Sequence, residues 1–344
     1  MTRAVSAGRR LVAGTVVAAA LLSGCASNPV KPAPPTVPPA TAAAAPAPST
    51  TPAGEIRKLG GSPQAAMVEK GSSALLVLGG GGAADTLTVL TREPGVPRTI
   101  NLPGPATALS QDAPGTALLA TRGGYLHVDV AAGTVRRVDI DGEQNTDFTA
   151  LARRADGTLV LGSADGTVFI LASGTDGETA VAHREKLFAR VDSIVTQGNT
   201  AVILDRGQTS VTAVDAEGNP AQALRAGEGA TTMTVDPAGR VLVADTRGDE
   251  LLVFGVDPLM LRQRYPVPEA PYGLAGSPRL AWVSQTAANT VIGYDLATGI
   301  PVEKVRYPTV QQPNLLAYDD ASGALYVVSG SGAGVQVIEN AGPR

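Results

Sequence analysis

The sequence offers carboxylates and amides that could bind a ligand, but few side chains suited to catalysis. Asp205-Arg206 and Asp245 with Arg247 stand about 40 residues apart, at the same place in a repeating pattern. They could form an alternating ring of charge that recognises a partner or a small anionic ligand. The alternative is that each Asp caps a turn and pairs with a nearby Arg. Asp and Asn oxygens also suit Ca²⁺ or Mg²⁺, although no short motif indicates such a site.

Residues for nucleophilic or general-base chemistry are scarce. The two histidines, His127 and His183, are expected in a third strand and an outer fourth strand of the repeat, away from a central channel. There is no Gly-x-Ser-x-Gly motif, and the run Gly79–Gly82 is not followed by the Lys-Ser/Thr of a phosphate loop. The single cysteine excludes a disulfide framework and a multi-cysteine metal site. We therefore favour a non-enzymatic protein with no metal and no cofactor other than a covalent lipid.

Charge argues against a nucleic-acid partner. The chain carries 27 basic and 31 acidic residues. Four of the basic residues and none of the acidic residues precede Gly54. The part from Gly54 onward is therefore clearly acidic, with 23 basic and 31 acidic residues. Such a surface should not be attracted to phosphate backbones or anionic lipids, and we read it as a contribution to solubility.

The first residues have the pattern of a targeting signal. Basic residues precede the apolar stretch Leu11–Leu22, which is too short to span a bilayer comfortably, and Leu22-Ser23-Gly24-Cys25 follows. These four residues resemble the lipobox of bacterial lipoproteins. The resemblance implies removal of residues 1–24, acylation of Cys25 with fatty acids such as palmitate, and anchoring at the extracytoplasmic face of the cell membrane. The alternative is an ordinary secreted protein with a chance cysteine after its signal.

Residues 25–53 are predicted to be a disordered linker. Nine of the 26 residues from 28 to 53 are proline and eight are alanine, with no acidic residue and almost no large apolar one. Such a stretch cannot bury a core and should sample extended polyproline conformations. It could hold the following domain, residues 54–344, roughly 80 Å from the bilayer.

A repeat of 39 to 43 residues fills this domain. Each unit has an apolar opening strand, a turn, two further apolar strands and a more polar fourth strand, such as Thr134–Ile140 or Val302–Tyr307. Four strands per unit is the dimension of a propeller blade. We therefore predict an all-β, seven-bladed β-propeller of four-stranded antiparallel blades; six or eight blades, a tandem β-sandwich and a β-helix are the alternatives. The seven units open at Met67, Leu109, Leu151, Ile194, Met233, Leu274 and Leu316.

The seventh unit ends after its third strand, Val335–Ile338, while Glu55–Leu59 precedes the first unit without belonging to it. We predict that this N-terminal strand completes the last blade and closes the ring. The linker should then leave from the outer rim of the last blade, with the central face free.

Two stretches resemble known propeller repeats. Val235–Thr246, continuing to Leu251–Phe254, resembles the NHL repeat. Trp282 through Ile292, then Tyr294–Gly299, is similar to the related YVTN repeat. The signal and linker also resemble those of mycobacterial and other actinobacterial conserved lipoproteins. Propellers of this kind serve as adaptors, binding modules and occasionally enzymes, so the resemblance implies fold rather than activity. Trp282, within a strand, is predicted to pack between blades rather than to form a ligand platform.

In a propeller, the blade-to-blade loops and the loops between second and third strands share one face around the channel. We expect candidate binding residues there, since that face is a common ligand site. They are Arg122, Asn145, Asp147, Asp165, Asp192, Asp205, Arg206, Asp245, Arg247, Glu269, Tyr272, Gln285, Asn289 and Asn314.

Three functions remain in competition. The leading one is a non-catalytic binding or scaffolding module in the cell envelope, with an envelope protein as partner and the membrane bound by the lipid anchor. The alternative is a lactonase-like, metal-dependent hydrolase acting on a small molecule at the channel mouth. Capture of a small ligand or glycan is a third, which the shortage of aromatic side chains disfavours for sugars.

Overall fold

The computed structural model describes residues 1–2, 34–80, 86–172 and 180–343. The predicted signal peptide from its third residue onward, with the lipobox residues Leu22, Ser23 and Gly24, lies outside the described residues, and so does Cys25. Among the described residues, no helix is long and apolar enough to cross a membrane.

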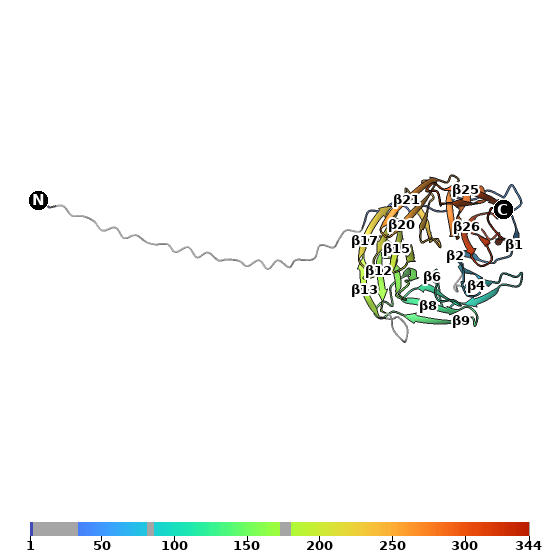
Figure 1. The fold of residues 1–344 in the computed structure, drawn as a ribbon. Helices are drawn as coiled ribbons and strands as arrows, with labels where there is room; N and C mark the ends of the chain where they lie inside the picture. The colour runs from blue at the N-terminus through green and yellow to red at the C-terminus, as the bar shows by residue number, and fades with distance from the viewer. Residues whose placement is uncertain (3–33, 81–85, 173–179, 344) are drawn as a thin grey trace. The chain divides into compact units, whose positions relative to one another are not determined.

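The described chain from Pro34 onward forms seven four-stranded antiparallel sheets, which we number as blades in chain order. Figure 1 shows them following one another around a ring, in the order of the sequence colours. Blade one contains β2 (Ser62–Val68), β3 (Leu75–Gly80), β4 (Thr86–Leu90) and β5 (Arg98–Asn101). Blade two contains β6 (Ala106–Gln111), β7 (Thr116–Thr121), β8 (Gly124–Asp129) and β9 (Thr134–Asp139). Blade three contains β10 (Phe148–Arg153), β11 (Leu159–Ser163), β12 (Thr167–Leu171) and β13 (Val181–Lys186).

Blades four to six repeat the same order of strands. Blade four contains β14 (Ser193–Gln197), β15 (Thr200–Asp205), β16 (Ser210–Val214) and β17 (Pro220–Arg225). Blade five contains β18 (Ala230–Val235), β19 (Val241–Asp245), β20 (Glu250–Val256) and β21 (Leu259–Pro266). Blade six contains β22 (Pro271–Gly276), β23 (Ala281–Gln285), β24 (Thr290–Asp295) and β25 (Val302–Pro308), with a short 3-10 helix at Thr286–Ala288.

Blade seven confirms the predicted closure of the ring. It contains β26 (Pro313–Asp319), β27 (Ala324–Ser329), β28 (Val335–Ile338) and the N-terminal strand β1 (Glu55–Arg57), which pairs with β28. Figure 1 shows β1 beside the C-terminus. Only glycine fits at position 54, where the chain enters β1. The φ of Gly54 is +74°, and a Cβ there would lie 2.1 Å from the Val337 carbonyl oxygen. The all-β, seven-bladed fold class is therefore confirmed.

The hydrophobic core lies between blades rather than in one central mass. Seven clusters of buried apolar side chains each join two neighbouring blades, and one of them joins blade seven to blade one. The second and third strands are the most buried, as their apolar sequences predict, while outer strands such as β13 alternate exposed and half-buried residues. Trp282 is fully buried and stacks between Tyr307 and Tyr318, each at 6.2 Å between centroids, which confirms its packing role.

The prediction of a free linker is wrong for residues 34–53. These residues run along the propeller from blade four to blade six, where the Ala53 amide donates to the carbonyl oxygen of Pro308 (3.0 Å). The amide of Val37 donates to the carbonyl oxygen of Gly207 in blade four (2.8 Å). The N-terminal end of this described stretch therefore lies beside blade four, not at the outer rim of the last blade. Composition could not reveal this docking, because it depends on acceptors that every backbone carries.

Candidate functional site

The candidate binding residues that the sequence predicts lie on one side of the ring. On this side, the loops between second and third strands meet the blade-to-blade loops. We call this side the central face. Its architecture depends on residues that end the second strands. The Asp205 carboxylate is fully buried and accepts from the amides of Ala189 (2.7 Å) and Gln208 (2.9 Å). Each contact joins a different loop to the end of β15, so Asp205 fixes the two loops together.

Asp245 occupies the equivalent place in blade five. Its buried carboxylate accepts from the amides of Glu228 (2.8 Å), Gly229 (2.7 Å) and Gly248 (3.1 Å). Gln285 ends the corresponding strand of blade six, donating to the carbonyl oxygen of Pro268 and accepting from Arg306. Asp205 and Asp245 are therefore loop caps, the alternative that their sequence positions left open, and do not build an exposed ring of charge.

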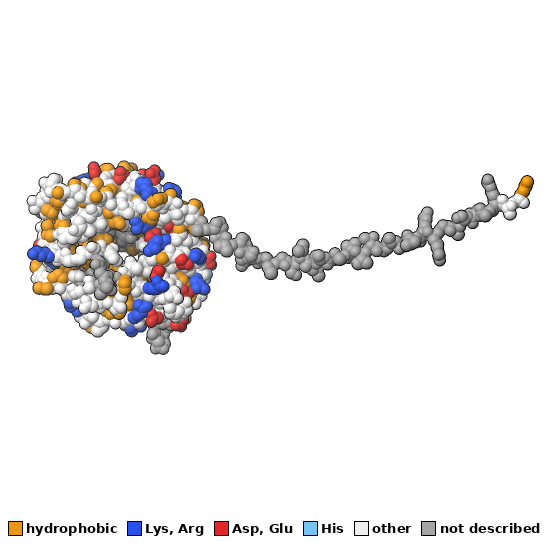
Figure 2. All heavy atoms as spheres, turned by 180° about the vertical axis from the view of Figure 1, so that it is seen from behind, with side chains coloured by type: hydrophobic (Ala, Val, Ile, Leu, Met, Phe, Trp, Pro, Cys, Tyr) orange, Lys and Arg blue, Asp and Glu red, His pale blue; other side chains and the backbone are white. Residues whose placement is uncertain are grey.

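A second group of predicted residues forms local polar contacts on blades two to four. Arg122 pairs with Asp147 (3.3 Å) and lies 3.5 Å from the Asn145 side-chain oxygen. Figure 2 shows one face of the ring, hollowed at its centre, with charged side chains of both signs gathered on one side of the hollow.

Two carboxyl groups of this region have shifted pKa values. Burial would raise the pKa of Asp165, but hydrogen bonds from Ser163, Lys186 and Thr167 outweigh it and lower the pKa to about 2. For Asp192 burial prevails and raises the pKa, although the amide of Arg206 donates to its carboxylate (2.8 Å). Both groups are thus engaged with neighbouring residues.

The third group binds the chain's own N-terminal segment. Arg206 Nη2 donates to the carbonyl oxygen of Ala40 (2.5 Å), and Arg247 Nη2 donates to that of Pro38 (2.7 Å). Asn289, which is buried in blade six, donates to the carbonyl oxygen of Pro46 (2.8 Å). We call residues 36–46 the docked segment. The structure thus brings together three predicted residues that are distant in sequence.

Two residues that hold the docked segment were missed by sequence reasoning. Gln311 Nε2 donates to the carbonyl oxygen of Ala45 (3.1 Å) and Gln312 Nε2 to that of Ala43 (2.8 Å). Gln312 also accepts from the amide of Ala45 (2.9 Å) and donates to the predicted residue Asn314 (2.9 Å). Their place in the loop before Asn314 was the available signal. The remaining predicted residues, Glu269 and Tyr272, lie in and just after the preceding blade-to-blade loop.

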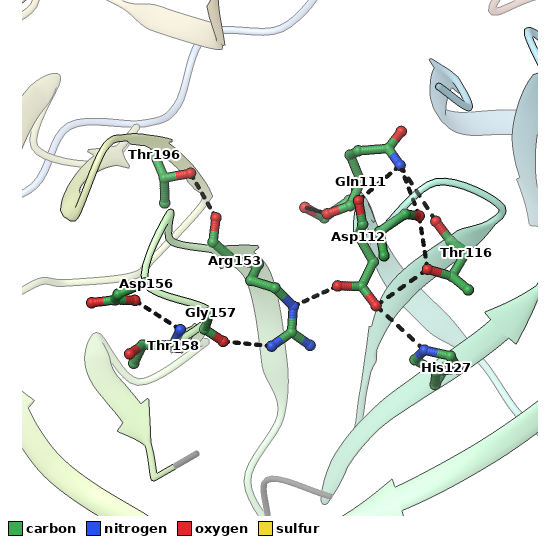
Figure 3. Close-up of polar contacts among 11 residues, drawn as sticks. Gln111, Asp112, Thr116, His127, Arg153, Asp156, Gly157, Thr158 and Thr196 are labelled. Carbon is green, nitrogen blue, oxygen red and sulfur yellow. Dashed lines mark hydrogen bonds and ion pairs between the residues drawn. The ribbon is translucent and has the colours of Figure 1, made fainter. Parts of the chain in front are cut away.

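The opposite mouth of the channel contains a cavity of about 670 Å³, which sequence reasoning did not anticipate. Asp112, Arg153 and Arg154 line it. Arg153 Nε donates to Asp112 Oδ1 (2.5 Å), so that one ion pair joins blade three to blade two. Figure 3 shows the two side chains pointing toward each other, with His127 contacting the second Asp112 oxygen at 3.3 Å.

Charged groups at this mouth form hydrogen bonds and ion pairs with other parts of the propeller. Burial lowers the pKa of Arg154, whose guanidinium donates to the carbonyl oxygens of Asp215 (2.5 Å) and Ala216 (2.8 Å). His127 lies in β8 and His183 in the outer strand β13, as predicted, and neither is among the residues lining the cavity. Within the described part of the chain, no group of three or more His, Cys, Asp or Glu residues is placed to hold a metal ion.

Comparison with known proteins identifies the fold but not the function. The sequence matches no protein-family model and no curated protein. Among solved structures, a chain of a mitotic checkpoint complex is similar with a TM-score of 0.69 and 13% identity, over 87% of this chain and 98% of that one. Streptogramin B lyase has a TM-score of 0.67 and 10% identity, over 83% and 97% of the two chains.

A chain of Kuenenia stuttgartiensis hydrazine synthase has a TM-score of 0.65 and 14% identity, over 85% of this chain and 98% of that one. At such identities the likeness concerns the fold alone. The chain is a seven-bladed β-propeller.

Proposed function

We propose that this protein is a lipid-anchored, non-catalytic binding module of the cell envelope. The observation that carries the proposal is the docked segment: side chains from blades four to seven converge on one extended stretch of polypeptide. A face that holds an extended chain in this way has the donors that a peptide-binding surface needs. The buried caps Asp205 and Asp245 support the same view, because they keep the loops of that face in place.

The anchor in this proposal is Cys25. Its support is the resemblance of Leu22–Cys25 to a lipobox and of the N-terminal region to mycobacterial-type lipoproteins, beside repeats similar to NHL and YVTN units. Two or more acyl chains give stable attachment, whereas one holds a protein only marginally. With residues 34–53 bound to the propeller, residues 25–33 are the part of the predicted linker that is left between the anchor and the bound stretch.

Replacing Cys25 by Ala tests the anchor. The variant should move from the membrane fraction to the soluble extracytoplasmic fraction, or retain its signal peptide, because the acylated sulfur is lost. Ser27→Ala, two residues further on, is the matched control and should fractionate like the parent. Identical membrane association of Cys25→Ala and the parent would contradict the anchor.

Crosslinking in cells tests the binding role. The anchored protein should form discrete adducts with envelope proteins at native expression levels, and Cys25→Ala should form fewer of them because it no longer shares their membrane. Recovery of the monomer alone, with no adduct from the anchored parent, would contradict a scaffolding role.

A further inference from the structure

We propose that the central face over blades four to seven is a receptor for extended, Pro/Ala-rich peptide segments, and that residues 36–46 are its resident, displaceable occupant. This inference rests on the proposed binding function and names the class of ligand and its site.

The chemistry of the contacts selects an extended backbone. Five side chains of the face donate to carbonyl oxygens of the docked segment, at positions 38, 40, 43, 45 and 46. A polyproline-type chain makes no internal hydrogen bonds, so these carbonyl oxygens are available without unfolding anything. Proline lacks an amide hydrogen, but no hydrogen bond is lost at Pro38 and Pro46 because the contacts there use the carbonyl oxygens. The donors are thus matched to a proline-rich chain.

The shape of the face selects small side chains at its centre. Ala40 is only 8% exposed, and it lies against Gly229, where an added Cβ would come within 2.9 Å of the Ala40 Cβ. A large residue at position 40 would therefore collide with blade five. At the end beside blade four, Pro35 and Val37 line a groove of about 590 Å³ together with Phe188 and Leu224. A ligand should therefore place apolar residues first and a small residue a few positions later.

The occupant is suited to exchange. It pairs with no strand of a sheet and is held largely by hydrogen bonds from loop side chains, including the exposed Arg247. Its advantage over a free peptide is covalent linkage, which gives it an effective concentration in the millimolar range. A partner carrying a similar segment could compete when both proteins are concentrated on the same membrane.

The test uses the full-length chain with residues 36–46 replaced by a Gly/Ser sequence of equal length, and a fluorescent peptide of residues 34–49. Fluorescence anisotropy should show saturable binding to this variant. Binding to the parent should be about tenfold weaker or more, because the resident segment reduces the fraction of free sites. A parent locked by a disulfide between Thr36→Cys and Gly207→Cys, in a Cys25→Ser background, should bind none.

Matched substitutions locate the site. In the Gly/Ser variant, Arg247→Ala should weaken peptide binding about tenfold or more, since one hydrogen bond from a charged group is lost. Arg262→Ala, which alters an exposed arginine of the outer strand β21, should leave binding unchanged.

Absence of saturable binding by the Gly/Ser variant, with a circular dichroism spectrum and melting temperature like the parent's, would overturn the inference. Equal binding by Arg247→Ala and Arg262→Ala would overturn it as well. Envelope adducts that persist in either case would leave the proposed binding function standing and show that the partner uses another surface.

Discussion

Replacing residues 54–61 by a Gly/Ser sequence of equal length is expected to lower the free energy of unfolding by about 3–5 kcal/mol. The replacement removes β1, whose three residues pair with Val335–Val337 of β28. It leaves the outer edge of β28 unpaired and removes Leu59, which packs on the buried cluster between blades seven and one. Because β1 joins the two ends of the domain, the whole ring should be destabilised rather than one blade.

Chemical denaturation followed by circular dichroism measures this effect. A Gly/Ser replacement of residues 26–33, which has the same length, is the matched control and should leave the transition unchanged. An unchanged transition for the 54–61 replacement would show that β1 does not fasten the ring.

Asp245→Ala is expected to cost about 3 kcal/mol of folding stability. The carboxylate is fully buried and accepts from three backbone amides, so its loss leaves three donors without a partner at once. Two of these amides belong to the loop that carries Gly229, against which Ala40 packs. The substitution should therefore also loosen the docked segment.

Thermal and denaturant unfolding measure the loss of stability. Asp141→Ala, at an exposed position in the loop between blades two and three, is the control and should change stability by less than about 0.5 kcal/mol. Equal stability of Asp245→Ala and Asp141→Ala would show that the buried cap does not hold the two loops.

The sequence predicts the blades well because each blade depends on local patterns. Apolar alternation indicates the strands, and turns such as Asp236–Gly239 separate them; Gly239 has the positive φ (+81°) that such a turn requires. The unpaired Glu55–Leu59 segment predicted ring closure, because a seventh unit with three strands needs a fourth.

The site depends on contacts between residues distant in the chain, and these have no local signature. Arg206 and Arg247 were identified by their place in the repeat, but their acceptors are backbone carbonyl oxygens, which any residue type supplies. The Asp112–Arg153 pair joins the turn after β6 of blade two to the end of β10 in blade three, between residues that are 41 positions apart. The proline-rich composition predicts an extended chain for residues 34–53, but it carries no information about what an extended chain binds.

A disulfide tests most directly whether the docked segment lies on the central face. A Cβ added to Gly207 would lie 3.5 Å from the Cβ of Thr36, within the range of natural disulfides. The two substitutions in a Cys25→Ser background provide the only thiols in the chain.

Under a glutathione redox buffer, the Thr36→Cys/Gly207→Cys protein should become a monomeric disulfide with no free thiol. Thr50→Cys/Gly207→Cys, whose first cysteine precedes the contact of Ala53 with blade six, should keep both thiols. Two free thiols in the Thr36→Cys/Gly207→Cys protein, under conditions that oxidise a reference dithiol, would show that the docked segment does not lie beside Gly207 on the central face.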